Sequence, residues 1–468
     1  MFHRLLTFLI ALAPMAATAR LADVQKTWET SSGARSWRNL VIQLVDAGYP
    51  FSAIPYMKDY LVQNRAPIDE ELDRAFEKMV VATGIRPFET LPDATLGQSR
   101  SSIVRYILAK KYFRKGQYAE ALGEVSRVNA NHPVAPFATH LRATIHGLQG
   151  KHDLAAGDYR DCVDFSRSRY NAESNPVKQR QLLINRDSCV AGLARTAFNK
   201  GDYARADYLY LDVPKSSYVW PEILFEEAWT SYYLKNYNRT LGKLVSYKAP
   251  VFDFVFNPEI DVLRAMSYLR LCLYQDASSI AEDFYAKWLE PSKQMRDFLN
   301  SHRRDYDYFF RLVTTFEQER VAKDFLMQSM LLSVAQDPAW QEMKQAYIDA
   351  IKEFNTIKSS SNSRFALTLL RNIKEVVASF QTLLGSYART QLHDKYGQLA
   401  RTFQDMSFIK LEILARKKQS LYESKSLGGK RGDVKYLQRN DKQYFWDFNG
   451  EFWADELGDY VFALGSEC

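Results

Sequence analysis

The chain has 468 residues, of which 46% are hydrophobic, 25% are charged and 14% are aromatic, and its formal net charge is +7. This composition excludes a disordered or fibrous protein, and a chain of this length is expected to contain two or more domains. With 20 Gly and 15 Pro residues, the chain is poor in the turns that sandwiches and barrels need, which favours helices. The mild positive charge is not a nucleic-acid footprint, so we expect no nucleic-acid partner.

Residues 1–19 have the pattern of a secretory signal peptide. Arg4 supplies a positive charge, Leu5 to Leu12 form a short apolar run, and Ala17-Thr18-Ala19 resembles a cleavage site. The alternative is an ordinary N-terminal core helix. The run is shorter than the roughly 20 apolar residues that cross a bilayer, and no later segment is long enough, so we expect no transmembrane segment in the mature chain. The sequence therefore predicts an exported protein, in the periplasm or at the cell surface.

A turn motif recurs through the middle of the chain. It begins as Gly116-Gln-Tyr118-Ala-Glu-Ala121, and four related segments end at Ala155, Ala206, Thr240 and Ala277, so that the last positions step by 34, 51, 34 and 37 residues. An alanine stands twelve residues before each of the five, at Ala109, Ala143, Ala194, Ala228 and Ala265. Because the side chains at a helix–helix contact set the distance between the helices, these alanines predict closely packed helix pairs.

A 34-residue period with a helix, a Gly-x-Tyr turn and a second helix resembles the tetratricopeptide repeat. The resemblance covers residues 102–290 and weakens in the last two copies, where Lys235 and Cys272 replace the glycine. Gly48 starts a degenerate copy upstream, and a polar insertion near residues 167–183 is predicted to extend a helical hairpin. The resemblance implies an all-α solenoid whose concave surface is lined by the first helix of each repeat.

Five segments are expected along the chain. They are the signal peptide (1–19), degenerate helical repeats (20–100), the solenoid (101–290), a long-helix domain (291–425) and an aromatic tail (426–468). Within the long-helix domain, helices are predicted over 318–335 and again from Pro338. The apolar residues of the following stretch alternate steps of 4 and 3, as in the heptad seam of a coiled coil: Leu369, Ile373, Val376, Phe380, Leu383 and Tyr387, then Leu392, Tyr396, Leu399, Phe403 and Met406. The seam serves either an intramolecular helical hairpin or a partner's helix.

The tail is dense in aromatic residues, with eight of them between Tyr444 and Phe462. We expect the tail to fold back and dock on the core. The alternative is a glycan-binding platform that uses Trp446 and Trp453.

The four cysteines contain no Cys-x-x-Cys pair, so paired thiolates for a metal are not indicated. Cys162 falls late in one predicted helix and Cys189 early in the next, and in an exported protein we expect them to form a disulfide. Cys272 either pairs with Cys468 or stays free as a small apolar residue. The sequence has no zinc-protease, phosphate-loop or nucleophile-elbow motif. We therefore expect no enzyme, metal or cofactor, with an enzyme of unrecognised residues as a further alternative.

The outward positions of the first helices supply the candidate partner-binding residues. These are Tyr106, Lys110, Phe113, His140, Arg195, Phe198, Phe225, Trp229 and Tyr232. Such an aromatic groove suits an extended or helical peptide with apolar anchors, because Trp, Tyr and Arg dominate binding hot spots. It lacks the basic cluster that would hold a C-terminal carboxylate. Alternatively, the aromatic residues contact the C-terminal helices.

Two stretches, Phe256–Ala277 and Phe448–Gly458, are similar to periplasmic repeat proteins of gliding and predatory bacteria. This resemblance implies a scaffold for protein partners in an envelope complex of motility or adhesion, associated with the envelope peripherally. The alternative function is a glycan- or peptidoglycan-binding protein that uses the aromatic tail.

Overall fold

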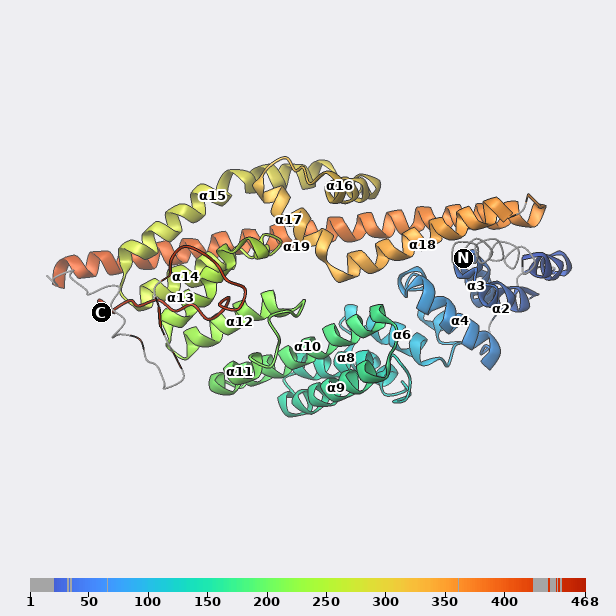
Figure 1. The fold of residues 1–468 in the computed structure, drawn as a ribbon, viewed down its shortest axis with the longest axis horizontal. Helices are drawn as coiled ribbons and strands as arrows, with labels where there is room; N and C mark the ends of the chain where they lie inside the picture. The colour runs from blue at the N-terminus through green and yellow to red at the C-terminus, as the bar shows by residue number, and fades with distance from the viewer. Residues whose placement is uncertain are drawn as a thin grey trace, which may run out of the picture. The chain divides into compact units, whose positions relative to one another are not determined.

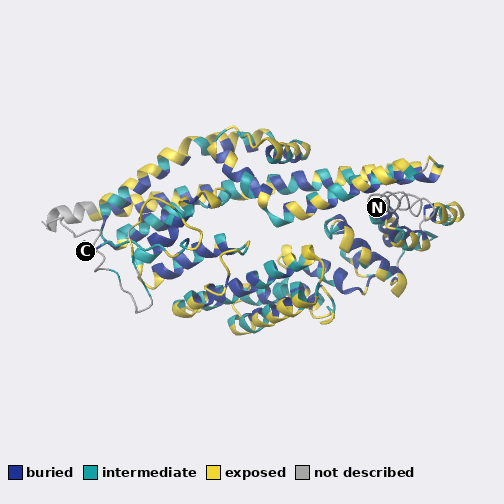
Figure 2. Cartoon of the chain, in the orientation of Figure 1, coloured by how far each residue is buried: buried dark blue, intermediate teal, exposed yellow. Residues whose placement is uncertain are grey.

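The computed structural model describes residues 21–31, 33, 36–64, 66–360, 362–423, 437, 443, 445–446 and 448–468. The predicted signal peptide and Tyr444 lie outside this part of the chain. Every regular element of the described residues is a helix (Figure 1). The predicted all-α fold is confirmed. Figure 2 shows that most of these helices have one buried and one exposed face, which is how amphipathic helices share a core.

Consecutive helix pairs occupy the predicted repeats (Figure 1). The five pairs are α6 (Ser102–Arg114) with α7 (Tyr118–Val125), α8 (Ala135–Leu148) with α9 (His152–Ala172), α10 (Pro176–Asn199) with α11 (Tyr203–Tyr210), α12 (Trp220–Tyr233) with α13 (Tyr237–Val245), and α14 (Glu259–Arg270) with α15 (Tyr274–Ser301). The degenerate copy upstream forms α2 (Trp37–Asp46) and α3 (Pro50–Gln63), followed by α4 (Glu70–Thr83). The insertion lengthens α9 and α10 instead of forming a separate loop.

The turn inside each pair has the same backbone geometry. Its first residue has a positive φ: 72° at Gly116, 62° at Lys235 and 58° at Cys272. The next amide then donates to the carbonyl five residues back, for example from Gln117 to Tyr112 at 2.9 Å. This hydrogen bond caps the first helix and sets the direction in which the chain continues into the second helix. Glycine adopts the left-handed conformation without steric cost, which explains why it recurs and why the lysine and cysteine copies looked weak.

The chain divides into two compact units. Unit 1 consists of Met1–Ile145, Asp305–Leu312 and Asp337–Ala388; unit 2 consists of His146–Arg304, Val313–Gln336 and Arg389–Cys468. These units differ from the predicted segments, because part of the long-helix region folds with the N-terminal helices. In unit 1, α18 (Pro338–Ser360) and the first half of α19 (Arg364–Glu423) share a core with α2 to α4. The ring centroids of Phe51 and Phe380, for instance, lie 6.1 Å apart.

Two details of the long-helix region correct the sequence-based expectation. The helix expected over 318–335 is wrong at its start, because α16 (Tyr306–Glu319) ends there and α17 (Phe325–Gln336) begins only after Arg320, whose φ is +57°. The heptad seam is also wrong at Leu383 and Tyr387, because Leu384 and Ala388 are buried in their place. The steps of four from Phe380 to Leu392 follow one face of an α-helix. Three residues of the second half of the predicted seam, Leu392, Leu399 and Met406, are fully buried.

In unit 2, residues 451–468, here called the C-terminal strap, lie along α13. The Asn238 side chain exchanges two hydrogen bonds with the Leu464 backbone, each 3.0 Å long. A Cβ atom on Gly242 would lie 1.6 Å from the carbonyl oxygen of Tyr460, so only glycine permits this approach. The strap also inserts Leu457 into the core formed by α10 to α12. The structure therefore places this part of the tail on the repeats.

A buried carboxyl group joins α18 to the first turn of α3 within unit 1. The carboxylate of Glu353 accepts hydrogen bonds from the Phe51 amide (3.1 Å), the Ser52 amide (2.7 Å) and the Ser52 hydroxyl (2.6 Å). Burial raises the pKa of Glu353 to about 7, and these hydrogen bonds offset only part of that effect.

Glu353 should make stability depend on pH in a defined direction. The folded-state pKa of Glu353 exceeds the value of 4.5 for an exposed glutamate. The stabilisation by protonated Glu353 is therefore fully present below pH 4.5 and is lost as the pH rises through about 7. We expect the melting temperature of the Glu353→Gln protein, measured by circular dichroism, to fall less between pH 4.5 and 7.5 than that of the wild type. Glu375→Gln, which removes an exposed carboxyl of α19, should match the wild type. Parallel curves for all three proteins would contradict this role.

The left-handed turn predicts a stabilising substitution. Lys235→Gly should raise the free energy of unfolding by about 1 kcal/mol, because a non-glycine residue is strained in this conformation. Lys235→Ala removes the same exposed side chain but keeps Cβ, and it should give no such gain. Denaturant unfolding of the three proteins checks the difference, and equal gains from both substitutions would attribute the effect to the lysine side chain instead.

Candidate partner-binding site

The nine candidate groove residues are distributed over both units. Unit 1 contains Tyr106, Lys110, Phe113 and His140, and unit 2 contains Arg195, Phe198, Phe225, Trp229 and Tyr232. His140 is half-buried on α8. The structure assigns the others to four different environments.

Three of the candidates belong to the framework of their own repeats. Phe113, Phe198 and Tyr232 each contact the tyrosine five residues later, at the start of the second helix. The ring centroids lie 5.8 Å, 5.1 Å and 5.4 Å apart, respectively. The recurrence of one pair in three repeats shows that these rings support the turn, a contact that the groove assignment did not include. The constant spacing of five residues was visible in the sequence and could have identified them.

Two further candidates are committed to contacts between helices of unit 2. Phe225 is buried in a cluster with residues of α13 and α14, including Leu244 and Leu263. The guanidinium of Arg195 donates to Glu226 at 2.6 Å and to Glu222 at 3.1 Å, and so ties α10 to α12. Phe225 is therefore buried, whereas the Arg195 side chain remains 42% exposed beside its ion pairs.

Trp229 is half-buried and packs against the cluster that contains Phe225 and Leu263. Its ring lies 5.6 Å from that of Tyr232 and 6.0 Å from that of Tyr233, measured between centroids. Tyr233 is 46% exposed and stacks on Tyr203, with centroids 4.8 Å apart and planes at 14°. We call Phe198, Tyr203, Trp229 and Tyr233 the aromatic patch. Tyr203 and Tyr233 were not among the candidates, because their contribution depends on rings brought together from α10, α11 and α12.

In unit 1, the candidates on α6 lie in a charged environment. The Lys110 ammonium is 5.6 Å from the ring centroid of Tyr106. Burial lowers the pKa of Lys110, while the nearby carboxylates of Glu89 and Glu342 act in the opposite direction. Burial also raises the pKa of Tyr106, again with contributions from Glu342 and Glu89. Since Glu342 lies on α18, the charge of a C-terminal helix of unit 1 acts on this face of α6.

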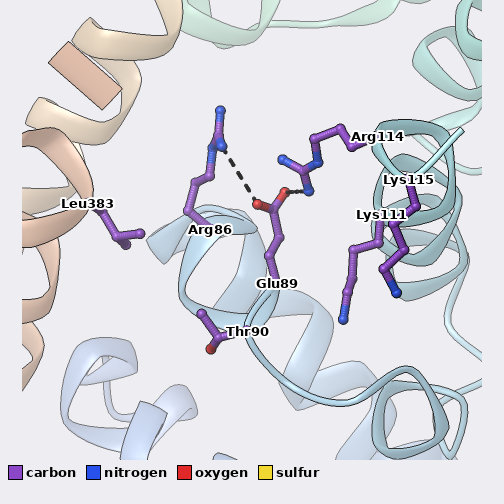
Figure 3. A pocket seen from close by; sticks show the side chains of 7 residues that line it. All are labelled: Arg86, Glu89, Thr90, Lys111, Arg114, Lys115 and Leu383. Carbon is purple, nitrogen blue, oxygen red and sulfur yellow. Dashed lines mark ion pairs between the residues drawn. The ribbon is translucent and has the colours of Figure 1, made fainter. Parts of the chain in front are cut away.

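A pocket of about 280 Å³ lies beside these residues within unit 1 (Figure 3). Its lining residues come from the segment after α4, from α6 and from α19: Arg86, Glu89, Thr90, Lys111, Arg114, Lys115 and Leu383. Figure 3 shows the Glu89 carboxylate between two guanidinium groups. It lies 2.9 Å from Arg114 and 3.7 Å from Arg86.

A second carboxylate holds the two lysines of the pocket. Asp93 lies 2.7 Å from the Lys111 ammonium and 2.8 Å from that of Lys115. The hydrogen bonds from Lys111 and Lys115 lower the pKa of Asp93, so it stays ionised. Unit 1 therefore contains a basic cluster, which the sequence-based groove was thought to lack. It was missed because the Arg86–Thr90 segment and α19 lie outside the repeat pattern.

The four cysteines form two disulfides. Cys162 on α9 bonds to Cys189 on α10, with Cα atoms 6.2 Å apart. Cys272, in the turn before α15, bonds to Cys468 at the end of the strap, with Cα atoms 5.1 Å apart. The sulfurs of both pairs are thus engaged and cannot serve as thiolate ligands.

The described helices define an all-α protein built from tetratricopeptide-like helical repeats. No protein-family model matches the chain, and no curated protein is similar to it in sequence. A solved structure that it resembles is the tetratricopeptide-repeat domain of P58(IPK), at 14% identity over 82% of this chain and 98% of that chain, with a TM-score of 0.20. Within the described residues, no helix combines the length and the apolarity that a bilayer span needs.

Proposed function

We propose that the protein is an exported scaffold that holds protein partners in a cell-envelope complex, and that it catalyses no reaction. The observation that best supports this proposal is the aromatic patch beside Arg195. Partly exposed Trp and Tyr rings that are held in place by neighbouring rings lose little side-chain entropy on binding, and such residues dominate interaction hot spots. The signal-peptide pattern and the two disulfides support an oxidising compartment such as the periplasm.

The similarity of two stretches to periplasmic proteins of gliding and predatory bacteria supports a more specific proposal. We propose that the scaffold belongs to a motility or adhesion complex and associates with the envelope peripherally. The partner would bind as an extended or helical segment with apolar anchors on the aromatic patch.

The scaffold proposal is tested by the loss of a defined partner. Crosslinking in the native envelope first identifies a recurrent partner protein, and purified proteins then measure its affinity. Trp229→Ala combined with Tyr233→Ala should weaken binding at least about tenfold, the expected effect of removing a hot spot, while the helical circular dichroism stays unchanged.

Tyr208→Ala serves as the matched control. This substitution removes a 61% exposed tyrosine of α11 in the same unit but outside the patch, so it should leave the affinity unchanged. An unaltered affinity of the double variant would place the partner site elsewhere, and equal losses in both proteins would point to a general effect on unit 2.

A second candidate function rests on the exposure of two tryptophans. Trp446 is 72% exposed and Trp453 is 57% exposed. Exposed aromatic faces suit stacking on sugar rings, which supports the glycan- or peptidoglycan-binding alternative. Pull-down on purified peptidoglycan tests it: Trp446→Ala and Trp453→Ala should each reduce retention, whereas the Trp229→Ala protein should be retained like the wild type.

A further inference from the structure

The charge of the unit 1 pocket is unbalanced. Among the described residues, four cations line it and two carboxylates, Glu89 and Asp93, pair with them. Each carboxylate is shared by two cations, so each half of the pocket has an excess of one positive charge. The excess charges belong to two separate subsites: Arg86 and Arg114 around Glu89, and Lys111 and Lys115 around Asp93.

Three of the cations remain accessible despite these ion pairs. The side chains of Arg86, Arg114 and Lys115 are 32%, 41% and 51% exposed, whereas that of Lys111 is 10% exposed. A guanidinium has five N–H donors, so each arginine retains donors after pairing with Glu89. These donors can form the short, charge-assisted hydrogen bonds that carboxylates favour.

The arginine subsite is held in position before any ligand arrives. The Arg86 guanidinium lies 5.8 Å from the ring centroid of Tyr387, whose hydroxyl donates to Asp337 at 2.8 Å. Glu89 also pairs with Arg114 of α6, so both guanidinium groups lie beside the same carboxylate. Leu383 adds an apolar wall from α19. A preorganised cation pair beside an apolar wall reduces the entropy that a ligand must give up on binding.

We propose that this pocket binds an acidic peptide segment, with one carboxylate in the arginine subsite and a second in the lysine subsite. The inference rests on the proposed scaffold function and names the chemistry of a partner segment. Two separate single charges match two carboxylates spaced along a peptide better than they match one phosphate dianion. Side-chain carboxylates and a C-terminal carboxylate offer the same chemistry, and the experiment below distinguishes them.

The test uses the purified full chain and fluorescently labelled synthetic peptides. The probe is a peptide of alternating Asp and Gly residues, prepared with an amidated C-terminus and as the free acid, beside a twin in which Asn replaces every Asp. We expect the Asp peptides to bind at least about tenfold more tightly than the Asn twin at physiological salt. Tight binding of both Asp forms assigns the pocket to side chains, and tight binding of the free acid alone assigns it to a C-terminus.

Variants connect this binding to the pocket. Arg114→Gln combined with Lys115→Gln should remove the preference for Asp over Asn peptides, and Arg114→Lys should retain part of it, because lysine keeps the charge but not the fork geometry. Lys26→Gln, at a 79% exposed lysine of the same unit, should behave like the wild type. Circular dichroism confirms that each variant is folded.

Three results would overturn the proposal. They are equal affinities for the Asp and Asn peptides, an unchanged preference in the double variant, and displacement of the Asp peptide by inorganic phosphate at concentrations where acetate has no effect. Failure here is distinguishable from failure of the scaffold function. If the pocket variants still bind the crosslinked partner through the aromatic patch, the scaffold stands and only this inference fails.

Discussion

The repeats depend on one hydrogen bond, made by the amide that follows the left-handed residue of each turn. The same bond recurs from Tyr49 to Leu44, from Asp202 to Ala197 and from Leu273 to Tyr268, at 2.8 to 3.0 Å. Because this hydrogen bond caps the first helix and reverses the chain over two residues, it fixes the angle of the second helix to the first and the point along the first helix at which the second one starts. The alanine at the centre of the first helix is fully buried in all five repeats, and the framework ring pairs complete the turn. Packing of the two helices therefore follows from a local backbone constraint.

That constraint also explains what the sequence could predict. Glycine, tyrosine and alanine at fixed spacings report local geometry, so the helix pairs follow from the sequence even where Lys235 or Cys272 takes the glycine position. The exposure of the groove could not be predicted in the same way. Phe225 and Trp229 lie one turn apart on α12, yet Phe225 is buried and Trp229 is half-buried. Their difference arises from neighbouring helices, which the period does not encode.

Contacts between distant parts of the chain also could not be predicted from the sequence. The core of unit 1 joins α3 to α18 and α19, and the carboxyl group of Glu353 meets an amide some 300 residues away in sequence. Apolar periodicity identified the helices of the C-terminal region but not the helices against which they pack. The same reason hid the pocket, whose charged groups come from the segment after α4 and from α6, and whose apolar wall comes from α19. The tail was predicted to dock from its aromatic density, and the strap does contact the repeats, but Trp446, Phe448 and Trp453 stay exposed.

The two candidate surfaces differ in physical character, and this difference has consequences for a scaffold. The aromatic patch of unit 2 gains its free energy from the burial of apolar area, which salt hardly changes. The pocket of unit 1 acts through partly exposed charges, whose attraction is screened within about 10 Å at 0.1 M salt. A partner that engages both would therefore lose only part of its affinity as the ionic strength rises, whereas a partner confined to the pocket would lose most of it. In the proposed exported scaffold, where the external salt concentration can vary, an apolar anchor would keep a complex assembled while the charged contact sets its orientation.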